Sequence, residues 1–308
     1  MRLGMIERDG RKSVVAALDD ARLLDLDIAA KFARYETDVF TDMQKVIEEA
    51  DYGLEQADWL IKRSEKRAQL SMDEAQFLPP LMPVQFRDCL AFEQHLKGSF
   101  AAAEKMTGQA FDIPPVWYDQ PVYYKGNRMS FIGHQADVHW PAYAEFLDIE
   151  LELAAVIGKK GKDISRADAP GYIFGYTILN DISARDAQMA EMPGQLGPAK
   201  GKDFDTGNIL GPFIVTADEV PHPVALKMEA RVNGECWGGG TSADMHHDFA
   251  DIIAHISASE TLWPGEVIGS GTVGTGCGLE TGRQLKPGDR FELEIEKIGT
   301  LSNRITRG

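Results

Sequence analysis

Hydrophobic and polar positions divide the chain into two regions of different periodicity. The first region opens on a polar stretch with turn residues, passes through a β-branched pair at Val14 and Val15, and becomes charged and helical in pattern over residues 42–74. It ends in a proline-rich stretch at residues 79–83, where a fixed φ and a missing N–H interrupt regular structure. We therefore predict a small N-terminal domain over residues 1–84.

Beyond this boundary, short apolar segments alternate with turn sequences such as Asn233-Gly234 and Pro264-Gly265, a pattern typical of strands joined by tight turns. Two helices interrupt the pattern. One is predicted over residues 87–106, and the other follows Ser242, where apolar residues recur at helical spacing. The pattern predicts an α+β, β-rich fold for a second domain over residues 85–308.

The composition excludes several classes of function. The 308 residues include 32 basic and 48 acidic ones, and the resulting net charge of −16 argues against binding to nucleic acid or to an anionic membrane surface. No stretch approaches the roughly 18 apolar residues of a membrane-spanning helix, and the first residues lack the apolar core of a signal peptide. Cys89, Cys236 and Cys277 form no CxxC pair. We therefore expect a cytoplasmic protein without a disulfide framework.

The sharpest local signal is the alternating segment FLDIELELAAVIG at residues 146–158. As a strand, it places Asp148, Glu150 and Glu152 on one face, with neighbours about 7 Å apart. Clustered carboxylates repel one another unless solvent or a cation neutralises them, and Mg²⁺ and Ca²⁺ favour such oxygen ligands. The alternative is a solvated strand face, because residues 290–297 alternate in the same way with flanking basic residues.

A second polar group follows a predicted buried strand at residues 172–179. Asp181 lies where this strand ends, a position from which a rigid element can present a ligand or a catalytic group. Arg185 and Gln188 follow at a spacing of three, which places both on one face of a helical turn. A helix-capping role for Asp181 is the alternative interpretation.

Asp88 and His95 are seven residues apart in the helix predicted over residues 87–106, so we expect them on nearly the same helix face. A histidine can act as a general base near neutral pH, and a neighbouring carboxylate can bind a metal or tune that base. The alternative is a histidine that is only structural or exposed.

Other motifs lack the context that their chemistry requires. Residues 269–274 (GSGTVG) match GxGxxG, but further glycines and a turn follow instead of a helix, which argues against a dinucleotide site. Residues 197–202 (GPAKGK) imitate a phosphate loop with one residue too few, although Lys202 can either reach an anionic substrate or lie on a surface loop. Serine and cysteine acyl-enzyme chemistry is poorly supported, because there is no GxSxG elbow and no cysteine with an evident activating partner.

Taken in chain order, several segments together resemble the fumarylacetoacetate hydrolase family. They are RDCLAFEQH, DIELELAAVIG, GYTILNDISARDAQ, GPAKGKDF, VNGECWGGGTSADM, LWPGEVIGSGTVG and LKPGDRFELEIEKIGTLSN. The combination is specific, although each segment alone is not. The resemblance implies a catalytic domain built as a mixed β-roll, paired as a homodimer and preceded by a smaller, variable N-terminal domain.

The resemblance also implies roles for individual residues. Glu280 would be the acidic partner of His95, and Gly98 shows that the His-x-x-Glu pair of many bacterial relatives is absent. Leu90 and Met192 depart from substrate-contacting residues of related enzymes, so the substrate is not specified. The implied metal ligands are Asp88, Glu150, Glu152 and Asp181, the implied oxyanion-stabilising residues are Arg185, Gln188 and Lys202, and the implied substrate contacts are Tyr124 and Thr272.

These roles describe a hydrolase that cleaves the C–C bond of a 1,3-diketo acid, such as fumarylacetoacetate or an acylpyruvate, with Mg²⁺, Ca²⁺ or Mn²⁺. His95 would activate water, and the cation would stabilise the enolate that leaves. A decarboxylase or tautomerase of an oxo-dioic acid needs the same cation and a proton shuttle but no attack by water, so it is the alternative on the same fold. Two further alternatives are a nucleotide-dependent oxidoreductase that uses residues 269–274 and a non-catalytic Ca²⁺-binding module.

Overall fold

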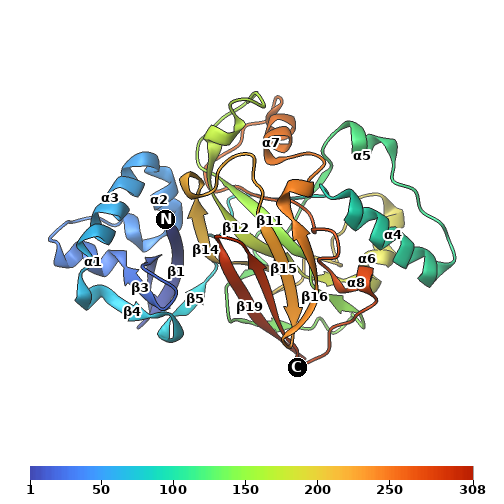
Figure 1. The fold of residues 1–308 in the computed structure, drawn as a ribbon, viewed down its shortest axis with the longest axis horizontal. Coiled ribbons are helices and arrows are strands. Elements are labelled where there is room, and N and C mark those ends of the chain that lie inside the picture. Colours follow the sequence, from blue (N-terminus) through green and yellow to red (C-terminus); the bar gives the residue numbers. More distant parts are fainter. Residues whose placement is uncertain (308) are drawn as a thin grey trace.

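The computed structural model describes residues 1–307, which form an N-terminal lobe and a larger C-terminal lobe (Figure 1). The N-terminal lobe, drawn in blue, ends in short 3-10 turns and strands rather than in a continuous helix to residue 74. Its strands and α-helices are β1 (Arg2–Arg8), β2 (Arg11–Ala17), β3 (Arg22–Asp25), α1 (Leu26–Phe32), α2 (Met43–Glu48), α3 (Ala50–Arg63), β4 (Gln69–Ser71) and β5 (Gln76–Leu78).

The C-terminal lobe contains most of the strands, so the predicted α+β, β-rich fold is confirmed. Among the helices of residues 1–307, none combines the length and the apolar character needed to cross a bilayer. The elements are β6 (Phe86–Cys89), α4 (Glu93–Thr107), α5 (Pro115–Asp119), β7 (Tyr123–Lys125), β8 (Phe131–Ile132), β9 (Asp137–His139), β10 (Leu147–Asp148), β11 (Leu151–Ile157), β12 (Ile173–Asp181), β13 (Ser183–Ala184), α6 (Arg185–Glu191), β14 (Asn208–Thr216), β15 (Lys227–Val232), β16 (Glu235–Thr241), α7 (Phe249–Ser257), β17 (Val267–Gly269), α8 (Gly278–Thr281), β18 (Arg290–Ile295) and β19 (Gly299–Thr306).

One 12-stranded sheet runs through both lobes in the order β4-β3-β2-β1-β14-β12-β11-β17-β6-β7, with β5 beside β1 and β8 beside β14. The lobes are joined where β1 pairs antiparallel with β14. They also share a core, in which Leu3 and Val14 lie with Phe86 and Leu210. The domain boundary after residue 84 stays a prediction. Because β1 pairs with β14, the two lobes share one hydrogen-bonded sheet.

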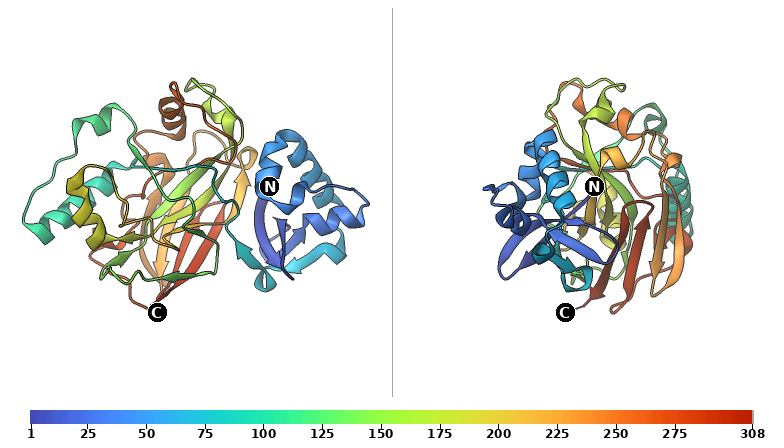
Figure 2. Two further views of the ribbon diagram at one scale, coloured as in Figure 1. Left: turned by 180° about the vertical axis from the view of Figure 1, so that it is seen from behind. Right: turned by 60° about the vertical axis from the view of Figure 1, so that its left-hand side comes forward.

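A second, five-stranded sheet in the order β16-β15-β18-β19-β9 covers one face of the large sheet. Figures 1 and 2 show its strands layered beside β11 and β12. Successive residues of β11 alternate between two cores: Leu153 packs with Leu293 of the second sheet, whereas Ala154 packs in the core shared with the N-terminal lobe. Both faces of β11 and β12 are therefore buried along their whole length, and any charged side chain on them must be paired inside the protein.

Two predicted elements near the candidate site are wrong in detail. The helix predicted from residue 87 begins only at Glu93, because residues 86–89 form β6 and pair in parallel with β17, far away in the sequence. The acidic segment is broken between β10 and β11, where the backbone of Glu150 pairs instead with Cys277. Asp88 therefore lies on a strand and His95 on a helix, and a shared helix face does not bring them together.

The two alternating acidic segments have opposite environments. Asp148, Glu150 and Glu152 are buried, at 0%, 5% and 0% exposure. On β18, by contrast, Glu294 is exposed and pairs with Arg231 at 2.7 Å. The solvated-face interpretation is thus correct for β18 and wrong for the first segment.

Candidate active site

Three carboxylates from separate strands meet in the interior of the large sheet. Asp88 on β6, Glu152 on β11 and Asp181 at the end of β12 each offer an oxygen atom within 4.8 Å of the others, and all three side chains are buried. Strand β17 lies between β6 and β11, and Gly269 sits where it passes the carboxylates. A Cβ at Gly269 would overlap Asp88 Oδ1 and lie 2.9 Å from Glu152 Oε2. The carboxylates can meet across β17 because this residue has no side chain.

The segment after Gly269 holds these carboxylates in place. The backbone N–H of Gly271 donates to Glu152 Oε2 at 3.0 Å and to Asp88 Oδ1 at 3.3 Å, and Thr272 Oγ1 donates to Glu152 Oε1 at 3.4 Å. The GSGTVG sequence, which lacks the context of a dinucleotide site, thus builds part of the carboxylate cluster. The predicted substrate residue Thr272 contacts a carboxylate of that cluster.

The cluster has the chemistry of a site for a hard divalent cation. Burial raises the pKa of Asp88 to about 8, and the charge of Asp181 adds to this effect. Burial also raises the pKa of Asp181, and burial together with Asp88 raises the pKa of Glu152 well above its usual range. Within residues 1–307, Asp181 Oδ1 is buried without a hydrogen-bond partner. A crowded set of carboxylate oxygens, one of which has no hydrogen-bond partner, suits Mg²⁺, Mn²⁺ or Ca²⁺ as the bound cation.

Glu150, the fourth predicted metal ligand, lies beside the cluster and is paired with side-chain cations. Lys202 Nζ is 2.5 Å from Glu150 Oε2 and 2.6 Å from Asp181 Oδ2, while Arg185 Nη1 is 2.7 Å from Glu150 Oε1. Burial alone would raise the pKa of Glu150, but Arg185 and Lys202 hold that pKa well below its ordinary value. Lys202 therefore connects Glu150 to the three-carboxylate cluster.

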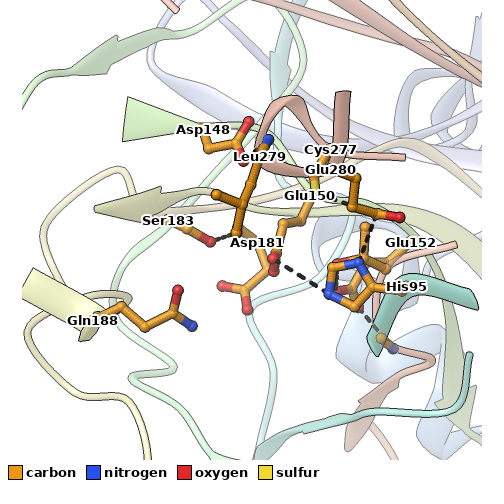
Figure 3. A network of polar contacts seen from close by, with 12 residues as sticks. His95, Asp148, Glu150, Glu152, Asp181, Ser183, Gln188, Cys277, Leu279 and Glu280 are labelled. Atoms are coloured by element: carbon orange, nitrogen blue, oxygen red, sulfur yellow. Dashed lines mark hydrogen bonds and ion pairs between the residues drawn. The ribbon is translucent and has the colours of Figure 1, made fainter. Parts of the chain in front are cut away.

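A histidine–glutamate pair faces Glu150 (Figure 3). His95 Nδ1 on α4 is 2.7 Å from Glu280 Oε1 on α8, and His95 Nε2 is 4.0 Å from Glu150 Oε1. A carboxylate accepts hydrogen bonds, so the contact with Glu280 assigns the imidazole proton to Nδ1 and leaves Nε2 able to accept a proton. The N–H of Thr275 donates to Glu280 Oε2 at 2.9 Å and fixes the carboxylate. The structure thus brings together the pair that the family resemblance implied.

Asp148 organises the site, although the roles implied by the family resemblance did not include it. It is fully buried and accepts four hydrogen bonds, from Arg185 Nε and Nη2 at 3.0 and 2.9 Å and from the N–H groups of Gly278 and Leu279 at 2.7 and 2.9 Å. It thereby ties Arg185 to the first residues of α8, the helix that carries Glu280. Its place in the alternating acidic segment is the sequence signal that could have identified it.

The remaining predicted residues lie at the edge of the same network. Tyr124 on β7 pairs with Asp88 across the sheet and donates from its hydroxyl to Asp181 Oδ2 at 2.7 Å. Gln188 Oε1 accepts from Arg185 Nη1 at 3.1 Å. All site residues predicted from the sequence therefore belong to one connected set of contacts.

The sequence and the fold of this chain match known proteins of one family. The fumarylacetoacetate (FAA) hydrolase C-terminal family matches residues 86–306. The oxaloacetate tautomerase YisK of Bacillus subtilis is 32% identical over 99% of this chain and 100% of its own length. The human mitochondrial oxaloacetate tautomerase FAHD2A is 40% identical over 60% of this chain and 59% of its own length. The solved fumarylacetoacetate hydrolase of Exiguobacterium antarcticum aligns over the full length of both chains with a TM-score of 0.76 and 26% identity.

These matches agree with a fold and a buried site that already indicate an enzyme of the fumarylacetoacetase type. The chain belongs to the fumarylacetoacetate hydrolase family. The family resemblance found in the sequence is thus confirmed. The similar proteins carry the names of tautomerases as well as of a hydrolase, so membership in the family does not by itself specify the reaction.

Proposed function

We propose that this protein is a divalent-metal-dependent tautomerase of a 2-oxo-dioic acid of the oxaloacetate type. The observation that carries the proposal is the 32% identity to an oxaloacetate tautomerase along essentially the whole chain. The site supports it, because one histidine base faces a carboxylate cluster suited to a cation. The sequence alone favoured a C–C hydrolase and gave the tautomerase or decarboxylase as the alternative; the named relatives favour the alternative.

The proposed reaction moves one proton between carbon and oxygen. The C–H bond beside the ketone breaks, its electron pair forms a C=C bond, and the former ketone oxygen gains a proton. His95 Nε2 is placed to receive and return this proton, because Glu280 holds the ring through Nδ1. The positive charge that the imidazole gains on protonation is offset by Glu280 at Nδ1 and by Glu150, 4.0 Å from Nε2.

Asp88, Glu152 and Asp181 are the residues that would hold the divalent cation. When bound, the cation would polarise the ketone and so make the neighbouring C–H bond more acidic. Lys202 supports these ligands: its ammonium contacts Glu150 Oε2, Asp181 Oδ2 and the Asp181 carbonyl, so its three N–H donors are used. In this arrangement Lys202 orients the carboxylates rather than presenting a free donor to an oxyanion.

A C–C hydrolase is the second candidate, because the same His95–Glu280 pair can activate water. The full-length structural alignment with a fumarylacetoacetate hydrolase supports it. Both candidates take a small keto acid as substrate. The homodimer implied by the family resemblance remains a prediction in either case.

One assay separates the candidate reactions. Enol oxaloacetate is mixed with the protein and Mg²⁺ or Mn²⁺, and the enol absorbance and pyruvate are followed together. A tautomerase speeds the loss of the enol without releasing pyruvate, whereas a decarboxylase releases pyruvate from oxaloacetate. A hydrolase is recognised in a parallel reaction with an acylpyruvate, from which it releases pyruvate. Enol loss no faster than with the metal ion alone would disprove the proposal.

A pair of histidine variants tests the base. We expect His95→Ala to lower the catalysed rate by at least about 100-fold, since a positioned general base contributes about that much or more. His222→Ala is the matched control, because His222 is exposed and lies outside the contact network of the site. Equal rates for His95→Ala and His222→Ala would show that His95 is not the base.

A further inference from the structure

A second group of potential metal ligands lies on the Nδ1 side of His95. His95, Cys277 and Glu280 each offer a ligand atom, and these three atoms all lie within 4.8 Å of one another. Glu280 Oε1 is the centre of the group, 2.7 Å from His95 Nδ1 and 3.3 Å from Cys277 Sγ. The side chains of His95 and Glu280 are 7% and 3% exposed, and Cys277 is fully buried. Figure 3 shows the three side chains together.

The donor atoms differ from those of the carboxylate cluster. Asp88, Glu152 and Asp181 offer oxygen only, which suits Mg²⁺, Mn²⁺ or Ca²⁺. The group around Glu280 offers nitrogen, sulfur and oxygen, the set that Zn²⁺ prefers and that Mg²⁺ does not. In tetrahedral Zn²⁺ sites the ligand atoms are about 3.3 to 3.7 Å apart, so shifts on the order of 1 Å would bring these three atoms into that geometry.

We propose that His95, Cys277 and Glu280 form an inhibitory site for a thiophilic divalent cation such as Zn²⁺. The inhibition rests on the proposed function of His95 as the base, whereas the binding does not. Binding replaces the thiol proton, which leaves to solvent, and moves the imidazole proton from Nδ1 to Nε2. With a proton already on Nε2, His95 accepts none from the substrate.

The surroundings of the group favour an added positive charge. The backbone of Cys277 pairs with that of Glu150, and Asp148 binds the N–H groups of the next two residues, so two carboxylates lie close by. Two side-chain cations lie nearby: Arg185 is already paired with Asp148 and Glu150, and Lys202 with Glu150 and Asp181. Both cations are thus held by other carboxylates, and within residues 1–307 no Lys or Arg side chain forms an ion pair with Glu280.

Cobalt provides a direct test of binding without any substrate. The reduced protein is saturated with Mg²⁺ to fill the carboxylate cluster and then titrated with Co²⁺, whose bond to a thiolate gives a charge-transfer band in the near ultraviolet. We expect the band in the parent and in Cys89→Ser and Cys236→Ser, and its loss in Cys277→Ser and Cys277→Ala. No band in the parent, or a band that persists in both Cys277 variants, would overturn the site. Circular dichroism of each variant checks that it is folded.

Zinc inhibition is then measured as the ratio of rates with and without Zn²⁺ within each variant, at saturating Mg²⁺. We expect the Zn²⁺ concentration for half-inhibition to rise at least tenfold in Cys277→Ser. An unchanged value would overturn the inhibitory role and place the effect of Zn²⁺ at the carboxylate cluster. If the protein has no tautomerase activity, the cobalt band still decides whether the site exists, so the two proposals fail separately.

Discussion

The carboxylate of Glu280 occupies the space that a side chain at position 98 would need. A Cβ on Gly98 would lie 2.6 Å from Glu280 Oε2 and 3.0 Å from Glu280 Cγ. Gly98 lies one turn after His95 on α4, so a glutamate there would be a local partner for the histidine. In this chain the acidic partner comes instead from α8, and the glycine makes room for it.

Gly98→Ala is therefore expected to impair catalysis without weakening the fold. The added methyl group meets the end of a flexible side chain, so Glu280 moves and its 2.7 Å contact with His95 Nδ1 is lost. Alanine is favoured over glycine inside a helix by about 0.5 to 1 kcal/mol, which offsets the cost of the shift. We expect at least a tenfold fall in kcat with a thermal midpoint close to that of the parent.

Gly171→Ala is the matched control for this prediction. Within residues 1–307, a Cβ at Gly171 meets no atom within 4 Å, and its φ is not in the left-handed region. Its kcat should equal that of the parent. If Gly98→Ala is also as active as the parent, Glu280 does not need its present position for catalysis.

Gly269→Ala is expected to weaken divalent cation binding. The new methyl group would overlap Asp88 Oδ1 and approach Leu179 Cδ2 and Glu152 Oε2 at 2.7 and 2.9 Å, which pushes the carboxylates of two strands apart. Metal sites depend on ligand positions held to a fraction of an ångström. We expect at least about a tenfold loss of Mn²⁺ affinity by isothermal titration calorimetry, as for other disturbed ligand supports.

Gly194→Ala provides the comparison, since a Cβ there meets nothing within 4 Å in the described part of the chain. Its Mn²⁺ affinity should be unchanged. Equal Mn²⁺ affinity of Gly269→Ala and the parent would show that the cation does not bind between Asp88 and Glu152.

Gly269 and Asp88 also show how far the sequence alone could lead. The acidic segment, the polar group around Asp181 and the β-rich class follow from motifs and alternation, which are local properties of the chain, whereas the roles of Glu280, Tyr124 and Thr272 came from the family resemblance. The placement of Asp88 on a strand does not, because β6 is defined by parallel pairing with β17, with Asp88 opposite Gly269. A hydrogen-bond partner that distant leaves no periodic trace near residue 88, so the local pattern predicted a helix there. The space that Gly269 leaves for the carboxylates could not be predicted for the same reason, because the side chains around Gly269 come from other strands.

Asp148 is expected to contribute to the stability of the fold through its buried contacts with Arg185 and the start of α8. Asp148→Asn keeps the shape of the side chain but removes the charge that Arg185 needs. It also turns one acceptor oxygen into a donor, which faces the N–H of Gly278 if it replaces Oδ1 and the N–H of Leu279 if it replaces Oδ2. Removing one partner of a buried ion pair costs about 3 to 5 kcal/mol. Because Glu150 still contacts Arg185 at 2.7 Å, we expect a loss near the lower end, about 3 kcal/mol in urea unfolding.

A surface ion pair gives the reference for this measurement. Asp137 contacts Arg304 at 2.9 Å, but the two side chains are 38% and 52% exposed. Asp137→Asn should therefore cost less than about 1 kcal/mol. Similar losses for the Asp148 and Asp137 variants would contradict the stabilising role of Asp148.

His134 is expected to make the fold less stable in mild acid. Its Nδ1 accepts a hydrogen bond from the N–H of Ser302 at 3.0 Å, and its ring stands edge-on to Phe77 of β5 at 5.3 Å. Burial lowers the pKa of His134 to about 4, with Arg290 adding to the effect. Below the ordinary histidine pKa of about 6.5, the unfolded chain therefore binds more protons than the folded one, so the stability present above that pH is lost as the pH falls toward 4.

The measurement that isolates this contribution compares the parent with two variants at two pH values. From about pH 7 to about pH 5, we expect the free energy of unfolding to fall by about 1 to 2 kcal/mol more in the parent than in His134→Gln, because glutamine does not titrate. His139→Gln serves as the control, since His139 is exposed, and it should follow the parent. An equal pH dependence of the parent and His134→Gln would mean that His134 titrates alike in the folded and unfolded chains, and that its contact with Ser302 does not depend on the neutral ring.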